Sequence, residues 1–289
     1  MEAEARNPHR LRRARGLRLA LFPMGVVLAI AVLAPLIWTV ITSVKPPEEA
    51  SASPPTGLPS RLDFANYFEL ADYGAGILSY LWNSIVVCFI TIVGTVIIST
   101  LAGYGFSRFQ FPLKGPLFVL ILAMLMIPFQ SIAIPMFILL KSLGLTNSLI
   151  GVGLVYITFQ LPFAIFVMRN AFDQVHREIE ESALVDGASQ SQVIRRIMVP
   201  LAIPGLVTVA LFAFLAAWNE FFAAFILLTK QSSFTLPIML LSAQGGVWFS
   251  VNWGALQAGV TIAMIPSLVF YVLLQRFYVG GVTTGAVKG

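Results

Sequence analysis

The chain has 289 residues, of which 58% are hydrophobic and only 11% are charged, and its formal net charge is +5. A soluble domain needs far more charge to cover its surface, so this composition excludes the soluble classes and indicates a protein embedded in a bilayer. The excess of positive charge is also typical of nucleic-acid binding. Its distribution along the chain, described below, instead indicates that the positive residues orient the spans in the membrane. We therefore expect no nucleic-acid partner.

Six segments are long and apolar enough to cross a membrane, because a helical span needs roughly 20 mostly apolar residues. In chain order they are Leu19–Ser43, Trp82–Tyr104, Pro116–Leu140, Leu149–Ala171, Ile203–Leu228 and Gly254–Phe277. Within them, we expect Pro128, Pro135 and Pro162 to interrupt helices, because proline lacks the backbone N–H of a helical residue. The expected fold class is an all-α integral membrane protein with six transmembrane helices.

The distribution of positive charge predicts the orientation of these spans. If the N-terminus is cytoplasmic, fourteen of the 18 lysine and arginine residues lie on inside segments. Positive residues favour the cytoplasmic side, so both termini are expected there. Residues 1–18 would form a basic cytoplasmic tail in contact with anionic lipid, residues 19–279 the membrane domain, and residues 280–289 a second cytoplasmic tail. The first apolar run is too long for a signal peptide, whose core has roughly 7–15 residues.

The loop at residues 173–200, between the fourth and fifth spans, is polar and has the pattern of two short helices. Gly187 is expected to take the left-handed conformation that ends the first helix near Asp186. Ser189 begins the second helix, and Gln192 three residues later completes a capping box. Pro200 is expected to end that helix. The sequence thus predicts a well-defined helix–turn–helix on the cytoplasmic side.

The loop also resembles the cytoplasmic signature of the inner-membrane permeases of binding-protein-dependent ABC importers. It reads Glu181-Ser182-Ala183, three residues, Gly187, nine residues, and then Ile197-Met198-Val199-Pro200. Other motifs narrow the resemblance to carbohydrate importers, and in particular to the second permease of maltose-type systems. These motifs are Ser43-Val44-Lys45-Pro46, Asn66-Tyr67, Asn83-Ser84, the run from Gly103 to Phe109, the run from Ala217 to Phe221, and the end of the chain from Gln275.

The resemblance implies that the loop contains a coupling helix, which docks on a separate ATPase and transmits its motion to the spans. The residues implied in this coupling are Glu181, Ser182, Ala183, Asp186, Gly187, Ile197 and Pro200. A helix lying on the membrane surface is the alternative, but anionic lipid would repel the acidic side chains of this loop.

The resemblance also implies partners and a solute. The partners would be a second homologous permease, two copies of the ATPase and an extracytoplasmic solute-binding protein, assembled in a prokaryotic plasma (inner) membrane. ATP and Mg²⁺ would bind to the ATPase, and this chain would hold no cofactor. The solute would be a mono- or oligosaccharide, or a related polyol or glycerol phosphate.

Polar residues inside the spans are candidates for the translocation path, because they are costly to bury in a bilayer. Two interpretations stand for Asn219 and Glu220: a wall or gate facing a water-filled path, or a buried pair that hydrogen-bonds one span to another. The other candidates are amides that could hydrogen-bond to sugar hydroxyl groups and aromatic rings that could stack on a sugar. For each of them, simple packing between helices is the alternative. They are Gln130, Gln160, Gln257, Tyr104, Tyr156 and Phe129.

The sequence contains no Gly-x-x-x-x-Gly-Lys-Ser/Thr phosphate loop, so ATP is not expected to bind to this chain. Two histidines and one cysteine predict no metal site, and no nucleophile motif indicates an enzyme. The main alternative is a secondary carrier driven by an ion gradient. Such carriers commonly have repeated halves and ionisable groups at the membrane midplane, whereas here only Glu220 qualifies as such a midplane group.

Overall fold

The computed structural model describes residues 8–54, 57–244 and 252–285. Over these residues the chain is helical and contains no strand, which confirms the all-α class. In chain order the helices and helical turns are α1 (Pro8–Ser43), α2 (Pro47–Ala50), α3 (Ala65–Ala71), α4 (Ile77–Arg108), α5 (Lys114–Ala123), η1 (Met124–Met126), α6 (Phe129–Ser142), α7 (Leu149–Asp173), α8 (Arg177–Val185), α9 (Gln190–Val193), η2 (Ile194–Met198), α10 (Val199–Leu201), α11 (Ile203–Asn219), α12 (Phe222–Leu227), η3 (Gln231–Ser233), α13 (Leu236–Gln244) and α14 (Trp253–Gly285).

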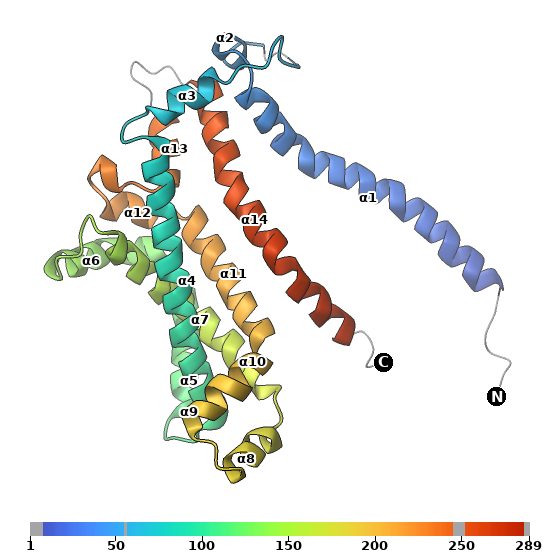
Figure 1. The fold of residues 1–289 in the computed structure, drawn as a ribbon, viewed down its shortest axis with the longest axis vertical. Helices are drawn as coiled ribbons and strands as arrows, with labels where there is room; N and C mark the ends of the chain where they lie inside the picture. Colours follow the sequence, from blue (N-terminus) through green and yellow to red (C-terminus); the bar gives the residue numbers. More distant parts are fainter. Residues whose placement is uncertain (1–7, 55–56, 245–251, 286–289) are drawn as a thin grey trace.

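Four of the six predicted spans are single apolar helices. They are residues Leu21–Ser43 of α1, the whole of α4 and α7, and residues Trp253–Gln275 of α14. Helices α4 and α7 pack together at the centre of the bundle (Figure 1). A Cβ atom on Gly103 of α4 would lie 2.6 Å from Met168 Cβ of α7, so the absence of a side chain there allows the two backbones to approach closely.

The third predicted span is divided into two helical parts next to Pro128. Residues Lys114–Met126 and α6 are both apolar, but their axes meet at 102°. Ile127 has an extended backbone (φ −84°, ψ 112°), because Pro128 disfavours the helical conformation of the residue before it. The expected interruption at Pro128 is confirmed. The two helices together form one bent span or a re-entrant segment.

The interruptions expected at Pro135 and Pro162 are wrong. Pro135 lies inside α6 and Pro162 lies inside α7, and both helices continue past them. Each proline removes a single backbone N–H bond, which helices in a membrane tolerate when neighbouring groups satisfy the freed carbonyl.

The predicted fifth span is also interrupted. Helix α11 ends at Asn219, Glu220 is extended (φ −74°, ψ 130°), and α12 begins at Phe222. A bend of 76° separates residues Gln190–Leu201 from α11. The prediction that Pro200 ends the preceding helix is wrong. The helical run continues through Pro200 to Leu201, because Pro200 lies in the first turn of α10, where a proline is tolerated.

The two ends of the bundle differ. Helices α2 and α3 lie at one end beside the start of α14, whereas α8, α9 and α10 lie at the other (Figure 1). Helix α1 begins, and α14 ends, on the side towards α8. The residues predicted as an N-terminal tail are helical from Pro8 onwards, since they extend α1. Residues 1–7 of that tail, and residues 286–289 of the C-terminal tail, lie outside the described residues.

Candidate functional site

The polar loop forms the helix–turn–helix that its sequence predicts. Helix α8 ends at Val185, and Gly187 has φ +86°, a conformation that a residue with a side chain adopts only with strain. The predicted capping box at the start of α9 is present, with the backbone N–H of Ser189 donating to Gln192 Oε1 over 2.8 Å. The turn between the two short helices is therefore fixed by local chemistry.

A buried polar network fastens α8 to the end of α4. Arg108 Nε donates to Glu180 Oε2 over 2.8 Å, and the two side chains are only 7% and 10% exposed. A second guanidinium nitrogen of Arg108 donates to the carbonyl oxygen of Val175 over 2.8 Å. The Tyr104 hydroxyl donates to Glu180, and the Gln190 amide of α9 donates to the Tyr104 oxygen. Both short helices are thus bonded to one membrane helix.

Apolar packing adds to these bonds. Val193 and Met198, from the second short helix and the π-helical turn η2, are fully buried in the same cluster as Met168 and Phe172 of α7. At the end of α4, the Ser107 hydroxyl donates to Asp173 Oδ1 over 2.6 Å. Because burial and hydrogen bonds act together, the loop is attached to α4 and α7 as one body.

The other face of the loop is open. Of the residues predicted to couple to an ATPase, Glu181, Ser182, Asp186, Gly187 and Pro200 are exposed, and Ala183 and Ile197 are partly buried. Two large apolar side chains are exposed beside the acidic ones: Leu184 at 40% and Val185 at 88%. Exposed apolar groups next to charged groups are typical of a surface that binds a partner.

Tyr104 does not lie with the other candidates for the translocation path. Its side chain is 2% exposed, and its ring packs edge-on against Phe172 with centroids 5.6 Å apart. Its position at the end of α4 makes it part of the network that holds α8. The sequence position of Tyr104 alone did not show whether its ring faces a path or packs against α8 at the end of α4.

Five other candidates line one cavity of about 250 Å³, which we call the central cavity. They come from α6, α7 and the break between α11 and α12: Phe129, Gln130, Tyr156, Gln160 and Glu220. The cavity therefore combines two amides, a phenol, a carboxyl group and a phenyl ring. Such a mixture can hydrogen-bond to hydroxyl groups and pack against an apolar ring face.

Glu220 is the most heavily bonded group of the central cavity. Its Oε2 atom accepts a hydrogen bond of 2.5 Å from the Tyr156 hydroxyl of α7. The backbone N–H of Ala223, in the first turn of α12, lies 3.0 and 3.1 Å from the two carboxylate oxygens. Glu220 thus caps α12 and ties it to α7, so it does bond one span to another.

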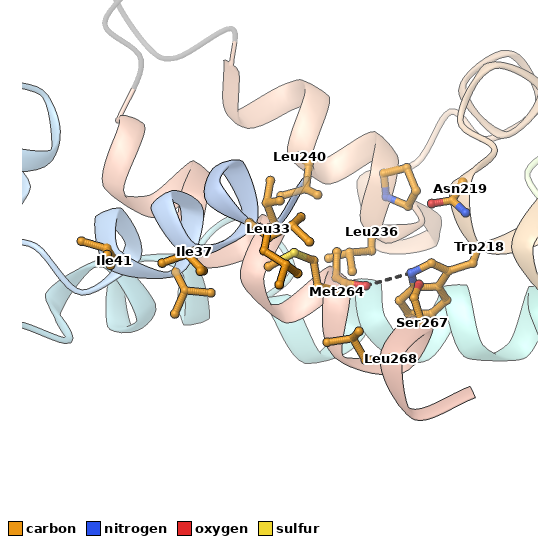
Figure 2. A pocket seen from close by; sticks show the side chains of 15 residues that line it. Leu33, Ile37, Ile41, Trp218, Asn219, Leu236, Leu240, Met264, Ser267 and Leu268 are labelled. Carbon is orange, nitrogen blue, oxygen red and sulfur yellow. Dashed lines mark hydrogen bonds between the residues drawn. The ribbon is translucent and has the colours of Figure 1, made fainter. Parts of the chain in front are cut away.

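Asn219 lies apart from Glu220, although the two are adjacent in sequence. Its Nδ2 atom donates to the Leu215 carbonyl of its own helix over 2.8 Å. Its side chain lines a different, almost wholly apolar cavity of about 680 Å³ between α1, α11, α13 and α14, where the Trp218 indole donates to the Ala263 carbonyl (Figure 2). The extended backbone at Glu220 directs the two side chains to different places.

Gln257 lies at the α2 and α3 end of the bundle. It lines a third cavity, of about 390 Å³, together with Trp38, Thr42, Lys45 and Trp253. The predicted path residues therefore fall into separate groups along the bundle rather than one lining.

Residues 94–282 match the family described as "Binding-protein-dependent transport system inner membrane component", over well more than half of the chain. The chain belongs to this family. The permease is therefore a multi-pass inner-membrane transport protein rather than an enzyme.

Several curated relatives resemble the permease over most of their length. It is 35% identical to the trehalose transport system permease protein SugB of Mycobacterium tuberculosis over 89% of this chain and 93% of the relative. It is 33% identical to the diacetylchitobiose uptake system permease protein DasC of Streptomyces coelicolor, over 92% and 95%. It is 32% identical to the trehalose/maltose transport system permease protein MalG of Thermococcus litoralis, over 94% and 97%.

A solved structure has the same fold. It is that of a bacterial ABC transporter involved in the import of the acidic polysaccharide alginate, with a TM-score of 0.79, 22% sequence identity, and coverage of 92% of the permease and 98% of the other chain.

Sequence reasoning missed the residues that attach the loop of the permease. Neither Arg108 nor Gln190 was among the predicted site residues. The available signal was the polar end of the run from Gly103 to Phe109, since an arginine beside the membrane needs a partner. The partner could not be chosen from sequence, because several acidic residues occur between positions 173 and 186.

Proposed function

We propose that this permease imports a carbohydrate inward across the plasma membrane, driven by ATP that a separate ATPase subunit hydrolyses. The loop of residues 173–200 faces the cytoplasm, as do both termini, and α8 docks on the ATPase. A second homologous permease completes the path, two copies of the ATPase supply the energy, and an extracytoplasmic binding protein delivers the solute. ATP and Mg²⁺ belong to the ATPase.

The observation that carries this proposal is the two-sided construction of α8. Its inner side is bonded to α4 through the buried pair of Arg108 and Glu180, whereas Glu181, Val185 and Asp186 are exposed. A short helix that is held rigidly on one side transmits a displacement applied to the other, because packed elements move as bodies. A flexible loop would absorb the same displacement.

The carbohydrate class rests on the solutes of the relatives and on the central cavity. The relatives named above transport trehalose, maltose or diacetylchitobiose according to their names. In the central cavity the amides of Gln130 and Gln160 offer donors and acceptors to hydroxyl groups, and Phe129 offers an apolar face. We propose that this cavity contacts the solute during passage.

The function is tested with the complete assembly in sealed vesicles that contain ATP. Uptake of radiolabelled trehalose, maltose and diacetylchitobiose is measured with the binding protein outside. At least one disaccharide should accumulate, and hydrolysis-deficient ATPase subunits should abolish accumulation. Uptake that continues without ATP but stops when ion gradients are dissipated would instead establish a secondary carrier.

Gly187 offers a matched pair of variants for the coupling step. Gly187→Pro cannot adopt φ +86° and loses the N–H that donates to the Leu184 carbonyl over 3.1 Å. We expect this variant to assemble but to hydrolyse ATP with little uptake. Gly187→Asn should keep most uptake, because asparagine tolerates the left-handed region. Normal uptake by the proline variant would contradict a rigid coupling helix.

A further inference from the structure

The cavity that contains Gln257 lies at the opposite end of the bundle from α8, beside α2 and the start of α14 (Figure 1). We call it the outer cavity, since the proposed orientation places it at the extracytoplasmic side. Its volume is about 390 Å³. The side chains that give it its chemistry are Trp38, Thr42, Lys45, Glu49, Trp253 and Gln257.

The walls of the outer cavity are held in place by buried bonds. The Asn66 amide of α3 donates to the carbonyl oxygens of Ser43 and Lys45 over 3.0 and 2.7 Å, which fixes the end of α1. The hydroxyl groups of Ser43 and Tyr67 lie 2.8 Å apart. These bonds join the Ser43–Pro46 and Asn66-Tyr67 motifs, which the sequence could not connect.

The other wall is fixed by a helix cap and an exposed hydrogen bond. Asn252 caps α14 by accepting from the Ala255 N–H over 3.0 Å, and its amide donates to Glu69 of α3 over 2.5 Å. Trp253 and Gln257 follow within the first turns of α14. The cavity is therefore built before any ligand arrives, which reduces the entropy cost of binding.

The Thr42 hydroxyl is a polar group of the cavity that is available to a ligand. Thr42 is 6% exposed, and its Oγ1 atom has no hydrogen-bond partner among the residues that the structure describes. A buried hydroxyl without a partner costs free energy unless a ligand meets it. Gln257 adds an amide that can donate and accept.

Two indole rings supply the apolar surface. Trp38 and Trp253 are 42% and 49% exposed, and the Lys45 ammonium lies over the Trp38 ring, 4.5 Å from its centroid. A pyranose has an apolar face of C–H groups and a rim of hydroxyl groups. Flat rings beside a hydroxyl, an amide and a carboxylate match both parts of that ligand.

We propose that the outer cavity is a saccharide-binding subsite, in which a sugar ring stacks on Trp253 while Thr42 and Gln257 hydrogen-bond to its hydroxyl groups. The inference rests on the proposed function, because the sugar is the transported solute. A phospholipid headgroup is a poorer occupant, because the Lys45 ammonium and the Glu49 carboxylate both line the cavity and together offer a phosphate group no net positive charge. The hydroxyl of Ser60 and its backbone N–H donate to that carboxylate and lower the pKa of Glu49, which keeps the charge in place.

Binding is tested by tryptophan fluorescence of the assembled transporter in nanodiscs, without binding protein. Trehalose, maltose and diacetylchitobiose are titrated separately. At least one should change the emission of the wild type at millimolar concentration, and Trp253→Phe should remove most of the change. Trp82→Phe is the matched control, because Trp82 is exposed on α4 and should leave the change intact.

Thr42→Val separates a binding role from a structural one. Valine keeps the shape but removes the hydroxyl, so we expect an apparent Kd raised about tenfold, which corresponds to about 1.4 kcal/mol. Thermal stability should stay equal or rise, because the hydroxyl has no partner within the described chain. Gln257→Leu should weaken binding similarly.

Three outcomes overturn the proposal. They are the absence of a fluorescence change with all three disaccharides, unchanged binding in both Thr42→Val and Gln257→Leu, and a Trp253-dependent change caused by phosphatidylglycerol and not by sugar. Vesicle uptake reports on the proposed function separately: saccharide binding at Trp253 without ATP-dependent uptake would retain the subsite and refute the import function.

Discussion

Arg108 Nε and Glu180 Oε2 lie 2.8 Å apart, although 72 residues separate the two in the chain. The pair joins the end of a central membrane helix to the short helix that carries the exposed acidic surface. Because both side chains are buried, the carboxylate and the guanidinium depend on each other for solvation. In the coupling mechanism proposed above, this bond carries a displacement of α8 to α4.

The first prediction concerns this pair. Arg108→Ala leaves the Glu180 carboxyl group buried without its ionic partner, and removing one partner of such a pair costs about 3–5 kcal/mol. We expect a lower melting temperature in detergent and ATP hydrolysis that no longer produces uptake. Arg61→Ala is the control, because the Arg61–Asp63 pair is on the surface, with the arginine side chain 74% exposed. Exposed pairs contribute about 0–1 kcal/mol, so equal effects of the two variants would contradict the assigned role.

A second prediction concerns the contact between α4 and α7. In Gly103→Ala the new methyl group would lie 2.6 Å from Met168 Cβ and 2.8 Å from the Arg169 backbone nitrogen. Neither atom belongs to a flexible chain end, so the helices must separate, at a cost of about 1–3 kcal/mol. Gly105→Ala, where no atom lies within 4 Å, should be neutral or slightly stabilising. Thermal unfolding of the two variants compares them directly; a neutral Gly103→Ala would disprove the close packing.

A third prediction concerns the break between α11 and α12. Glu220→Ala removes the cap of α12 and the bond to Tyr156, and loss of a cap costs about 0.5–2 kcal/mol. We expect faster hydrogen exchange of residues 222–227, and Tyr156→Phe should show part of the same effect. Asn219→Ala should leave this exchange unchanged, because the Asn219 side chain donates its hydrogen bond within α11. Faster exchange in all three variants would mean that any substitution near the break accelerates exchange, which would contradict a specific role of the Glu220 bonds.

A fourth prediction concerns the segment that precedes α13. Asn83 Nδ2 donates to the carbonyl oxygens of Ser232 and Phe234, each over 2.9 Å. Asn83→Leu leaves both carbonyls without this donor, at a cost of about 1–3 kcal/mol. Limited proteolysis should then cut residues 229–236 faster than in the wild type. Leu78→Ala, an exposed position on the same helix, should not change the cutting rate, and resistance of Asn83→Leu would show that other contacts hold the segment.

The sequence by itself determined that the chain lies in a bilayer, that it is all-helical, and that residues 173–200 form a helix–turn–helix. The high fraction of hydrophobic residues indicated a membrane protein. The lengths of the apolar segments located the spans that correspond to α1, α4, α7 and α14. The conformation of Gly187 and the capping box at Ser189 followed from residues within a few positions of one another, so local chemistry was sufficient.

Only the tertiary structure decided which distant residues meet. The side chains of Asn219 and Glu220 line different cavities, and Gln130 and Gln160 line the same one. Tyr104 was predicted to line the path but belongs to the network that holds α8. The bend at Pro128 and the break at Glu220 also set these positions. Such pairings depend on how the helices pack and where they bend. The pattern of apolar and polar residues along a sequence shows the period of each helix, but it does not show which other helices that helix contacts.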